Sequence, residues 1–164
     1  MVRCLRDAIS ERTRDANWGA AASNSAQLAT PLMMVISSDL RPLELGDPRT
    51  ELRRKLVAAV LRGEKIATAS LREQYGPDTN DPLPLPGESF LLAGYDDEPV
   101  GVVKTTDLRV VRAGDVDLQF ARDEGEGFAT VGQWRSAHER AWADREIMDD
   151  TLVVCMWFTL VERF

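Results

Sequence analysis

The stretch DPRTELRRKLVAAVLRGEKIATASL, residues 47–71, contains the clearest structural signal in the chain. Asp47 followed by Pro48 is typical of a helix start, and apolar residues then recur at helical spacing. Gly63 supplies a natural stop. The stretch therefore predicts a helix over Pro48–Arg62, followed by a short segment rich in small residues. The other helix face is basic and is interpreted as a solvated surface, made of Arg49, Arg53, Arg54 and Lys55.

Downstream of this stretch, the pattern predicts mainly strands. Residues 76–87 contain four prolines and are interpreted as a loop. Glu88–Ala93 and Pro99–Val111 have the composition of strands joined by a turn-rich segment of hairpin length. Leu152–Val161 is an unbroken apolar run that fits a strand buried on both faces.

Two short helices are predicted between these strands. Asp115 can cap one that runs to Ala121, and Thr130 can cap a second that carries Trp134 and Trp142 at near-helical spacing. The order of helix, strands, helices and strand predicts an α+β fold, a small mixed β-barrel flanked by helices.

Composition predicts one folded domain preceded by an arm. The 164 residues, 44% of them hydrophobic, suffice for a single core. Residues 1–46 include a polar, aperiodic segment at Ala20–Thr30, so they are interpreted as a loosely structured N-terminal arm. Residues 47–164 form the predicted domain.

Charge, cysteine content and hydropathy exclude several classes of protein. The net charge of −7 argues against extended duplex binding, which needs many basic contacts to phosphates. The two cysteines, Cys4 and Cys155, lack the spacing of a disulfide framework or a zinc site. Apolar runs fall short of the ~20 residues that span a bilayer, and no secretory signal is evident, so a cytoplasmic location is expected.

Three segments together carry a family resemblance. They are Gly63–Ala69, then Val103–Thr106, then Phe120–Gly127, followed by Trp134, Arg135 and His138. In order and spacing they resemble the ASCH domain family, in its longer bacterial form, over about residues 45–163. The resemblance implies a PUA-like β-barrel with a cleft between barrel and helices. It also implies that the ligand is a short single-stranded RNA or a modified nucleoside.

The resemblance further implies candidate catalytic residues. Members of the family have been linked to RNA cleavage and to removal of the acetyl group from N-acetylated cytidine. In the deacetylating members, which are shorter, a lysine, a threonine three residues later and a downstream glutamate form the catalytic set. These positions match Lys65, Thr68 and Glu124 in this sequence.

The chemistry of these side chains suits hydrolysis. Thr68 or a water molecule could attack, Lys65 could act as base and stabilise charge, and Glu124 could orient the lysine or donate a proton. In a regular strand, residues i and i+3 point to opposite faces, so Lys65 and Thr68 share a pocket only if the chain bends. Lys65 could instead complement the helix dipole, and Glu126 competes with Glu124 for the place in the cleft.

Other polar side chains could bind the ligand. They are Lys104 and Thr106 on one face of a predicted strand, Glu126 in the glycine-broken loop, and Arg135 on the last helix. His138, beside Trp134, is interpreted as a packed helix residue. The sequence has no phosphate-binding loop and no metal-ligand spacing, so neither cofactor nor metal is predicted.

Two classes of function stay open from the sequence. One is a metal-independent hydrolase, of the ribonuclease or N-acetylcytidine amidohydrolase type. The alternative is a non-catalytic module that binds single-stranded RNA or has a regulatory role. A monomer or a homodimer is expected in either case.

Overall fold

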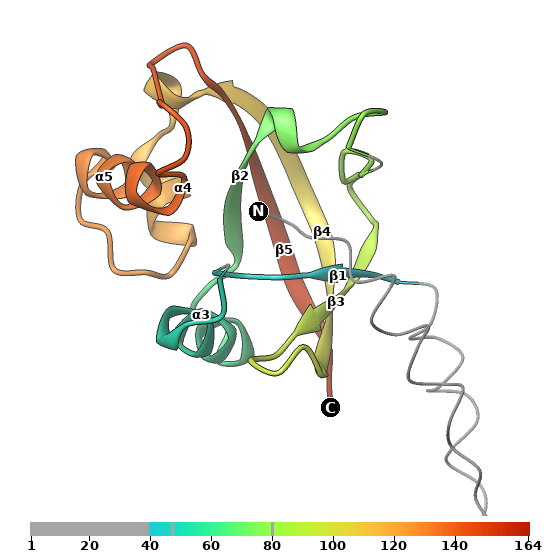
Figure 1. Cartoon of the computed structure of the whole chain (residues 1–164). Coiled ribbons are helices and arrows are strands. Elements are labelled where there is room, and N and C mark those ends of the chain that lie inside the picture. The colour runs from blue at the N-terminus through green and yellow to red at the C-terminus, as the bar shows by residue number, and fades with distance from the viewer. Residues whose placement is uncertain (1–39, 47, 80) are drawn as a thin grey trace, which may run out of the picture.

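A computed structural model describes residues 40–46, 48–79 and 81–164. Its centre is one mixed five-stranded sheet, curled into a half-barrel, with strand order β1-β3-β4-β5-β2 (Figure 1). The strands are β1 (Arg41–Leu43), β2 (Ala67–Leu71), β3 (Ser89–Ala93), β4 (Pro99–Arg112) and β5 (Leu152–Arg163). β1 runs parallel to β3, and all the other pairs are antiparallel. The predicted loop at 76–87 contributes no strand to this sheet.

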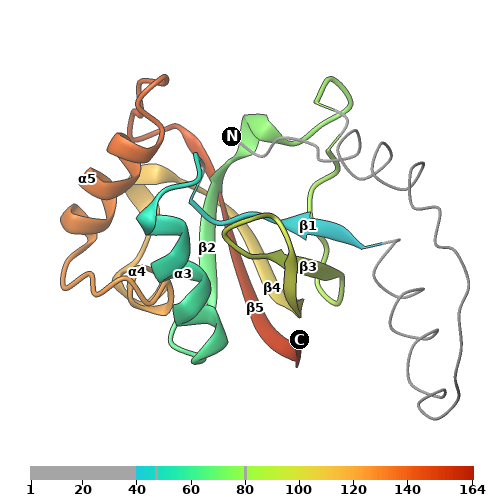
Figure 2. The same ribbon diagram turned by 60° about the horizontal axis from the view of Figure 1, so that its bottom comes forward.

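The helices gather on the β2 side of the sheet (Figure 2), and they bury two separate clusters of core residues. α3 (Glu51–Leu61) packs with Leu45, Phe90, Val103 and Phe158 on one face. α4 (Leu118–Asp123) and α5 (Val131–Ala141) cover the other face through a core that includes Phe120 and Trp134. β5 contributes to both clusters, so the predicted burial on both faces is confirmed for residues 153–158, whereas Leu152 and Val161 at the ends of the predicted range are exposed. Among the described residues, no helix has the length and apolarity needed to cross a membrane.

The first helix begins later than its sequence predicts. Thr50, in an extended conformation, is its N-cap and accepts a hydrogen bond from the amide of Leu52, so the proposed start at Asp47-Pro48 is wrong. Asp47 itself lies outside the described residues. Threonine can accept a hydrogen bond from a free first-turn amide, as aspartate can, and here the cap lies three residues further on.

The basic face of α3 is not uniformly solvated. Arg53 has a side chain only 1% exposed, and its guanidinium lies 2.8 Å from Asp97 Oδ1 and 3.3 Å from Glu44 Oε2. The interpretation of Arg53 as a surface residue is therefore wrong. Its partners come from the β3–β4 turn and from the segment after β1, neither of which is close to it in sequence.

Two other boundaries also move. Asp117, rather than Asp115, caps the short helix, which runs over Leu118–Asp123, while Ala113–Asp115 form a 3₁₀ turn. Residues 41–43, assigned to the arm from sequence, form β1, and Leu45 is buried in the core. The arm prediction for residues 1–39 lies outside the described residues. Thr130 caps α5 as predicted.

Candidate functional site

Lys65 lies in the short connection between α3 and β2. The amides of Glu64 and Lys65 both donate to the carbonyl of Ala59, so the chain is still attached to the end of α3 at this point. β2 begins only at Ala67. A straight strand from Glu64 is therefore absent, and the Lys65 side chain turns toward the end of α4.

The ammonium group of Lys65 is buried among acceptors from the loop after α4. Its Nζ donates to the carbonyl of Glu124 at 3.0 Å and to Glu126 Oε1 at 2.9 Å, and it lies 3.9 Å from Glu124 Oε2. The side chains of Lys65 and Glu124 are each 1% exposed, whereas that of Glu126 is 21% exposed. Both glutamates thus contact Lys65, with Glu124 on the inner side and Glu126 on the outer side.

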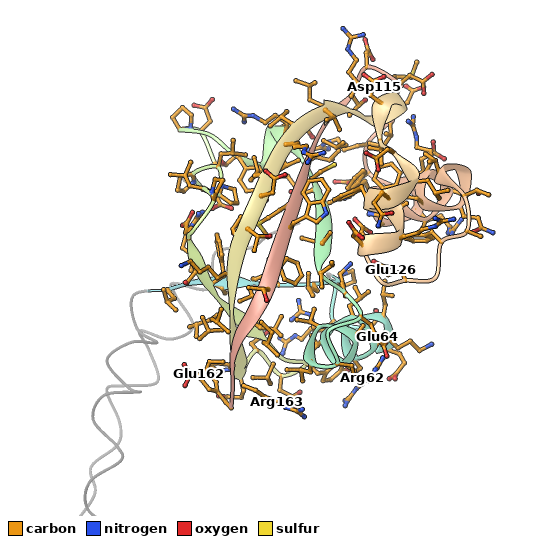
Figure 3. The ribbon with its side chains drawn as sticks, turned by 180° about the vertical axis from the view of Figure 1, so that it is seen from behind. Arg62, Glu64, Asp115, Glu126, Glu162 and Arg163 are labelled. Atoms are coloured by element: carbon orange, nitrogen blue, oxygen red, sulfur yellow. The ribbon has the colours of Figure 1, made fainter. Side chains whose placement is uncertain are left out.

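Gly125 allows this loop to approach Lys65 closely. Its φ of +66° favours glycine, and a Cβ built there would lie 2.3 Å from the carbonyl oxygen of Glu64 and 2.7 Å from the Cα of Lys65. Figure 3 shows Glu126 at the end of the α4–α5 unit that faces the segment of Glu64. The backbone contact holds the two glutamates in place over the lysine.

His138 completes the cluster from α5. Its ring stacks on Trp134 with centroids 4.4 Å apart, and its Nδ1 lies 2.9 Å from the Trp134 carbonyl. A carbonyl only accepts, so Nδ1 carries a proton, and Nε2 then faces Glu124 Oε2 at 3.4 Å. Burial lowers the pKa of His138, but the Glu124 carboxylate outweighs this and leaves the pKa above its usual value.

The Glu124 carboxylate is ionised, buried and incompletely bonded. Burial raises the pKa of this carboxyl group. The charge of Lys65 and the contact with His138 lower the pKa by more than burial raises it, so it lies below the ordinary value. The donors that face its oxygens are Nε2 of His138, 3.4 Å from Oε2, and the indole N–H of Trp134, and neither makes a short, well-aligned hydrogen bond. Buried carboxylate oxygens are normally fully bonded, so the loose contacts around Glu124 set this carboxylate apart from an ordinary core residue.

This arrangement predicts a pH-dependent stability. A raised folded-state pKa of His138 adds stability that is complete below its unfolded value of about 6.5 and is lost as pH rises through the folded value. The lowered pKa of Glu124 adds stability that is lost only as pH falls through that lowered value. Urea unfolding followed from pH 6 to 8.5 should show declining stability in the wild type.

His138 is the single histidine of the sequence, which makes the control simple. In His138→Gln the decline over this pH range should largely disappear. An equal decline in wild type and variant would contradict the assignment of the titration to His138.

We call this group of side chains the Lys65 cluster (Lys65, Glu124, Glu126 and His138), and Thr68 is not one of its members. Ala67 and Leu71 face the core beneath α4 and α5, so Thr68 points to the opposite face, as does its cross-strand neighbour Met156. No hydrogen bond joins Thr68 to Lys65 or Glu124 among the described residues. The nucleophile role implied for Thr68 stays a prediction.

The other predicted ligand-binding residues lie elsewhere. Lys104 and Thr106 are both exposed on β4, and Thr106 lines an open depression beside α4. Arg135 pairs with Glu139 at 2.7 Å and Asp149 at 3.4 Å and also donates to the carbonyl of Ile147, so it secures the segment after α5.

Within the described part of the chain, no three His, Cys, Asp or Glu side chains gather as metal ligands would.

Sequence patterns alone did not identify His138 as a member of the site. Its spacing from Trp134 indicates packing, and the structure shows that packing. The contact with Glu124 depends on how α5 folds back on α4, and no local sequence signal encodes it. The sequence signal for this region is the glycine-broken loop that follows α4 and carries Glu124 and Glu126.

Comparison with known proteins identifies the family. The family model described as the ASCH domain matches residues 44–162. An ASCH domain from Lactobacillus crispatus JV V101 shares the fold, with 22% identity, a TM-score of 0.67, and coverage of 80% of this chain and 85% of the other. A protein from Enterococcus faecalis V583 does likewise, with 24% identity, a TM-score of 0.65, and coverage of 76% and 83%.

A comparison with curated protein sequences gives no match. The predicted PUA-like α+β fold is confirmed by the shared architecture of the solved ASCH domain. The family match spans all three segments that supply the Lys65 cluster. The chain therefore belongs to the ASCH domain family.

Proposed function

We propose that this protein is an enzyme that cleaves short single-stranded RNA, with the Lys65 cluster as its active site. The observation that carries the proposal is the buried Glu124 carboxylate, held between the Lys65 ammonium group at 3.9 Å and the His138 imidazole at 3.4 Å. An acid and a base whose pKa values are moved apart by their surroundings are typical of proton-transfer sites.

RNA cleavage matches this set of side chains because the substrate supplies its own nucleophile. Glu124 takes the proton of the ribose 2′-hydroxyl, and O2′ attacks the adjacent phosphorus. As the bond from phosphorus to O5′ breaks, the His138 imidazolium donates its Nε2 proton to O5′. The products are a 2′,3′-cyclic phosphate and a 5′-hydroxyl. Lys65 stabilises the negative charge on the phosphoryl oxygens.

The position of Thr68 supports this reaction over an acyl transfer to threonine. Its hydroxyl lies on the opposite face of β2 from the core that Lys65 approaches. A reaction that starts from the 2′-hydroxyl needs no protein nucleophile, so the separation of Thr68 from the Lys65 cluster does not hinder it.

Glu126 controls access to Lys65 in this proposal. Its carboxylate bonds Lys65 Nζ at 2.9 Å, and it is the more exposed of the two glutamates. A phosphate can take its place once the side chain rotates outward, and Gly127 next to it, at φ +81°, has open space around it. Glu126 therefore occupies the phosphate position in the free protein.

The test is product analysis by mass spectrometry. Wild type, Glu124→Gln and Glu139→Gln are each incubated with a short single-stranded RNA and N-acetylated cytidine in one vessel. Wild type should give shortened RNA ending in a cyclic phosphate. Glu124→Gln should lower the rate by about 100-fold or more, because it removes the base. Glu139→Gln makes the same chemical change on the exposed side of α5 and should cleave like wild type.

The other outcomes are equally informative. Release of acetate without RNA cleavage would replace the ribonuclease with a nucleoside amidohydrolase. No product from either substrate, in protein with an intact circular-dichroism spectrum, would leave a non-catalytic RNA-binding module. Undiminished cleavage by a folded Glu124→Gln variant would exclude Glu124 as the base.

A further inference from the structure

An open depression lies beside the Lys65 cluster, between the outer face of the sheet and α4. Its volume is about 330 Å³, and β4 contributes Thr106 and Arg109, α4 contributes Gln119 and Asp123, and β5 contributes Trp157. We call it the Trp157 depression. None of its residues takes part in the chemistry proposed above.

Trp157 provides a fixed aromatic wall. Its Nε1 donates to Asp123 Oδ2 at 2.8 Å, and the edge of its ring packs against Phe120 with centroids 5.0 Å apart. Arg109 lies over the ring, with its guanidinium carbon 4.8 Å from the centroid. An indole held in this way loses little conformational freedom when a planar ligand stacks on it.

Arg109 can move at low cost. Its side chain is 59% exposed and is held by one exposed carboxylate, Asp107, at 2.9 Å. Exposed ion pairs of this kind contribute little to stability. The guanidinium can therefore leave the ring face to a base and then stack on that base or pair with its phosphate.

The charge around the depression determines which part of a nucleotide enters it. Asp107, Asp117 and Asp123 all line the depression. Asp123 is already engaged by Trp157 and by Gln119, whose Nε2 lies 2.8 Å away, but its charge still repels a phosphate. A neutral base fits the interior, and its phosphate stays at the rim near Arg109.

The Trp157 depression lies next to the Lys65 cluster, because residues of the two are neighbours in the backbone at two places. Trp157 pairs in register with Ala67, two residues after Lys65. Asp123 precedes Glu124 directly, and its carbonyl accepts a hydrogen bond from the amide of Ile66 at 2.9 Å. A strand of RNA with one phosphate at Lys65 can thus place a neighbouring base in the depression.

We propose that the Trp157 depression is a second nucleotide subsite, in which Trp157 and Arg109 stack a base next to the scissile phosphate. This inference rests on the proposed function and narrows its substrate to an oligonucleotide rather than a free nucleoside. Base stacking of this kind tolerates different sequences, because every base has an aromatic face.

The test compares ligand lengths by isothermal titration calorimetry. The probes are cytidine 3′-monophosphate and a 2′-O-methylated trinucleotide, which cannot be cleaved through a 2′-hydroxyl. Wild type should bind the trinucleotide at least about tenfold more tightly than the mononucleotide. Trp157→Leu and Arg109→Gln should each remove most of this gain without changing mononucleotide affinity. Arg112→Gln, an exposed arginine on the same strand outside the depression, should retain the gain.

The outcomes separate this inference from the proposed function. If the mononucleotide binds wild type and the trinucleotide binds no better, or if both variants keep the full gain, the subsite is overturned while the Lys65 site stands. If wild type binds neither probe, the proposed function is overturned and the subsite with it. Arg109→Gln guards against a folding defect in Trp157→Leu, because Arg109 lies outside the core.

Discussion

Replacing Lys65 by methionine is expected to lower the free energy of unfolding by about 3–5 kcal/mol, the usual effect of removing one partner of a buried ion pair. Methionine fills a similar volume but leaves the Glu124 carboxylate buried beside a neutral group. Glu126, on the outer side, also loses its partner at 2.9 Å. Urea denaturation followed by far-UV circular dichroism measures the change.

Two further variants define the cause of this loss. Lys104→Met makes the same substitution at an exposed position on β4 and should change the unfolding free energy by about 0.5 kcal/mol or less. Adding Glu124→Gln to Lys65→Met should recover part of the loss, because the uncompensated charge is gone. A loss that the second substitution does not reduce would show that packing around Lys65, rather than charge, is responsible.

The second large effect is expected at Gly125. An alanine there combines a φ of +66° with contacts of 2.3–2.7 Å to the backbone of Glu64 and Lys65, which cannot move aside as a side chain can. We expect Gly125→Ala to destabilise the protein by about 3 kcal/mol, from conformational strain and overpacking together. RNA cleavage should fall as well, since Glu124 and Glu126 flank the displaced glycine.

Gly127 offers a matched control two residues away. It also has a positive φ, +81°, but nothing lies within 4 Å of the added Cβ. Gly127→Ala should therefore show only the conformational cost, about 1 kcal/mol, with cleavage retained. Equal effects of the two substitutions on thermal unfolding would mean that the loop does not rest on the Lys65 backbone.

The sequence predicts the elements of this fold better than their boundaries. The strands at 89–93, 99–112 and 152–163 follow from their composition and turn signals, because those signals are local. Helix starts were less secure, since several polar residues near each start can serve as the cap. Thr50 and Asp117 fill that role where Asp47 and Asp115 were predicted.

Burial of charge was harder to predict than secondary structure. Arg53 looks like a surface residue on its own helix, but Glu44 and Asp97 from other segments lie against its guanidinium and make its burial tolerable. The site was predictable only in part, because some of its contacts also join segments that are distant in the sequence. Lys65, Glu124 and Glu126 come from segments that the family resemblance joins, whereas the contribution of His138 depends on how two helices pack.

The strand order has a consequence for biosynthesis. β2, which follows Lys65, pairs within the described sheet only with β5, which is translated after the other four strands of this sheet. Until β5 is inserted between β4 and β2, the segment that carries Lys65 is not joined to the rest of the sheet on which the helices with Glu124 and His138 pack. The sheet that supports the Lys65 cluster is therefore completed only after β5 has been synthesised, so the RNA cleavage proposed above should not begin on a nascent chain that still lacks β5.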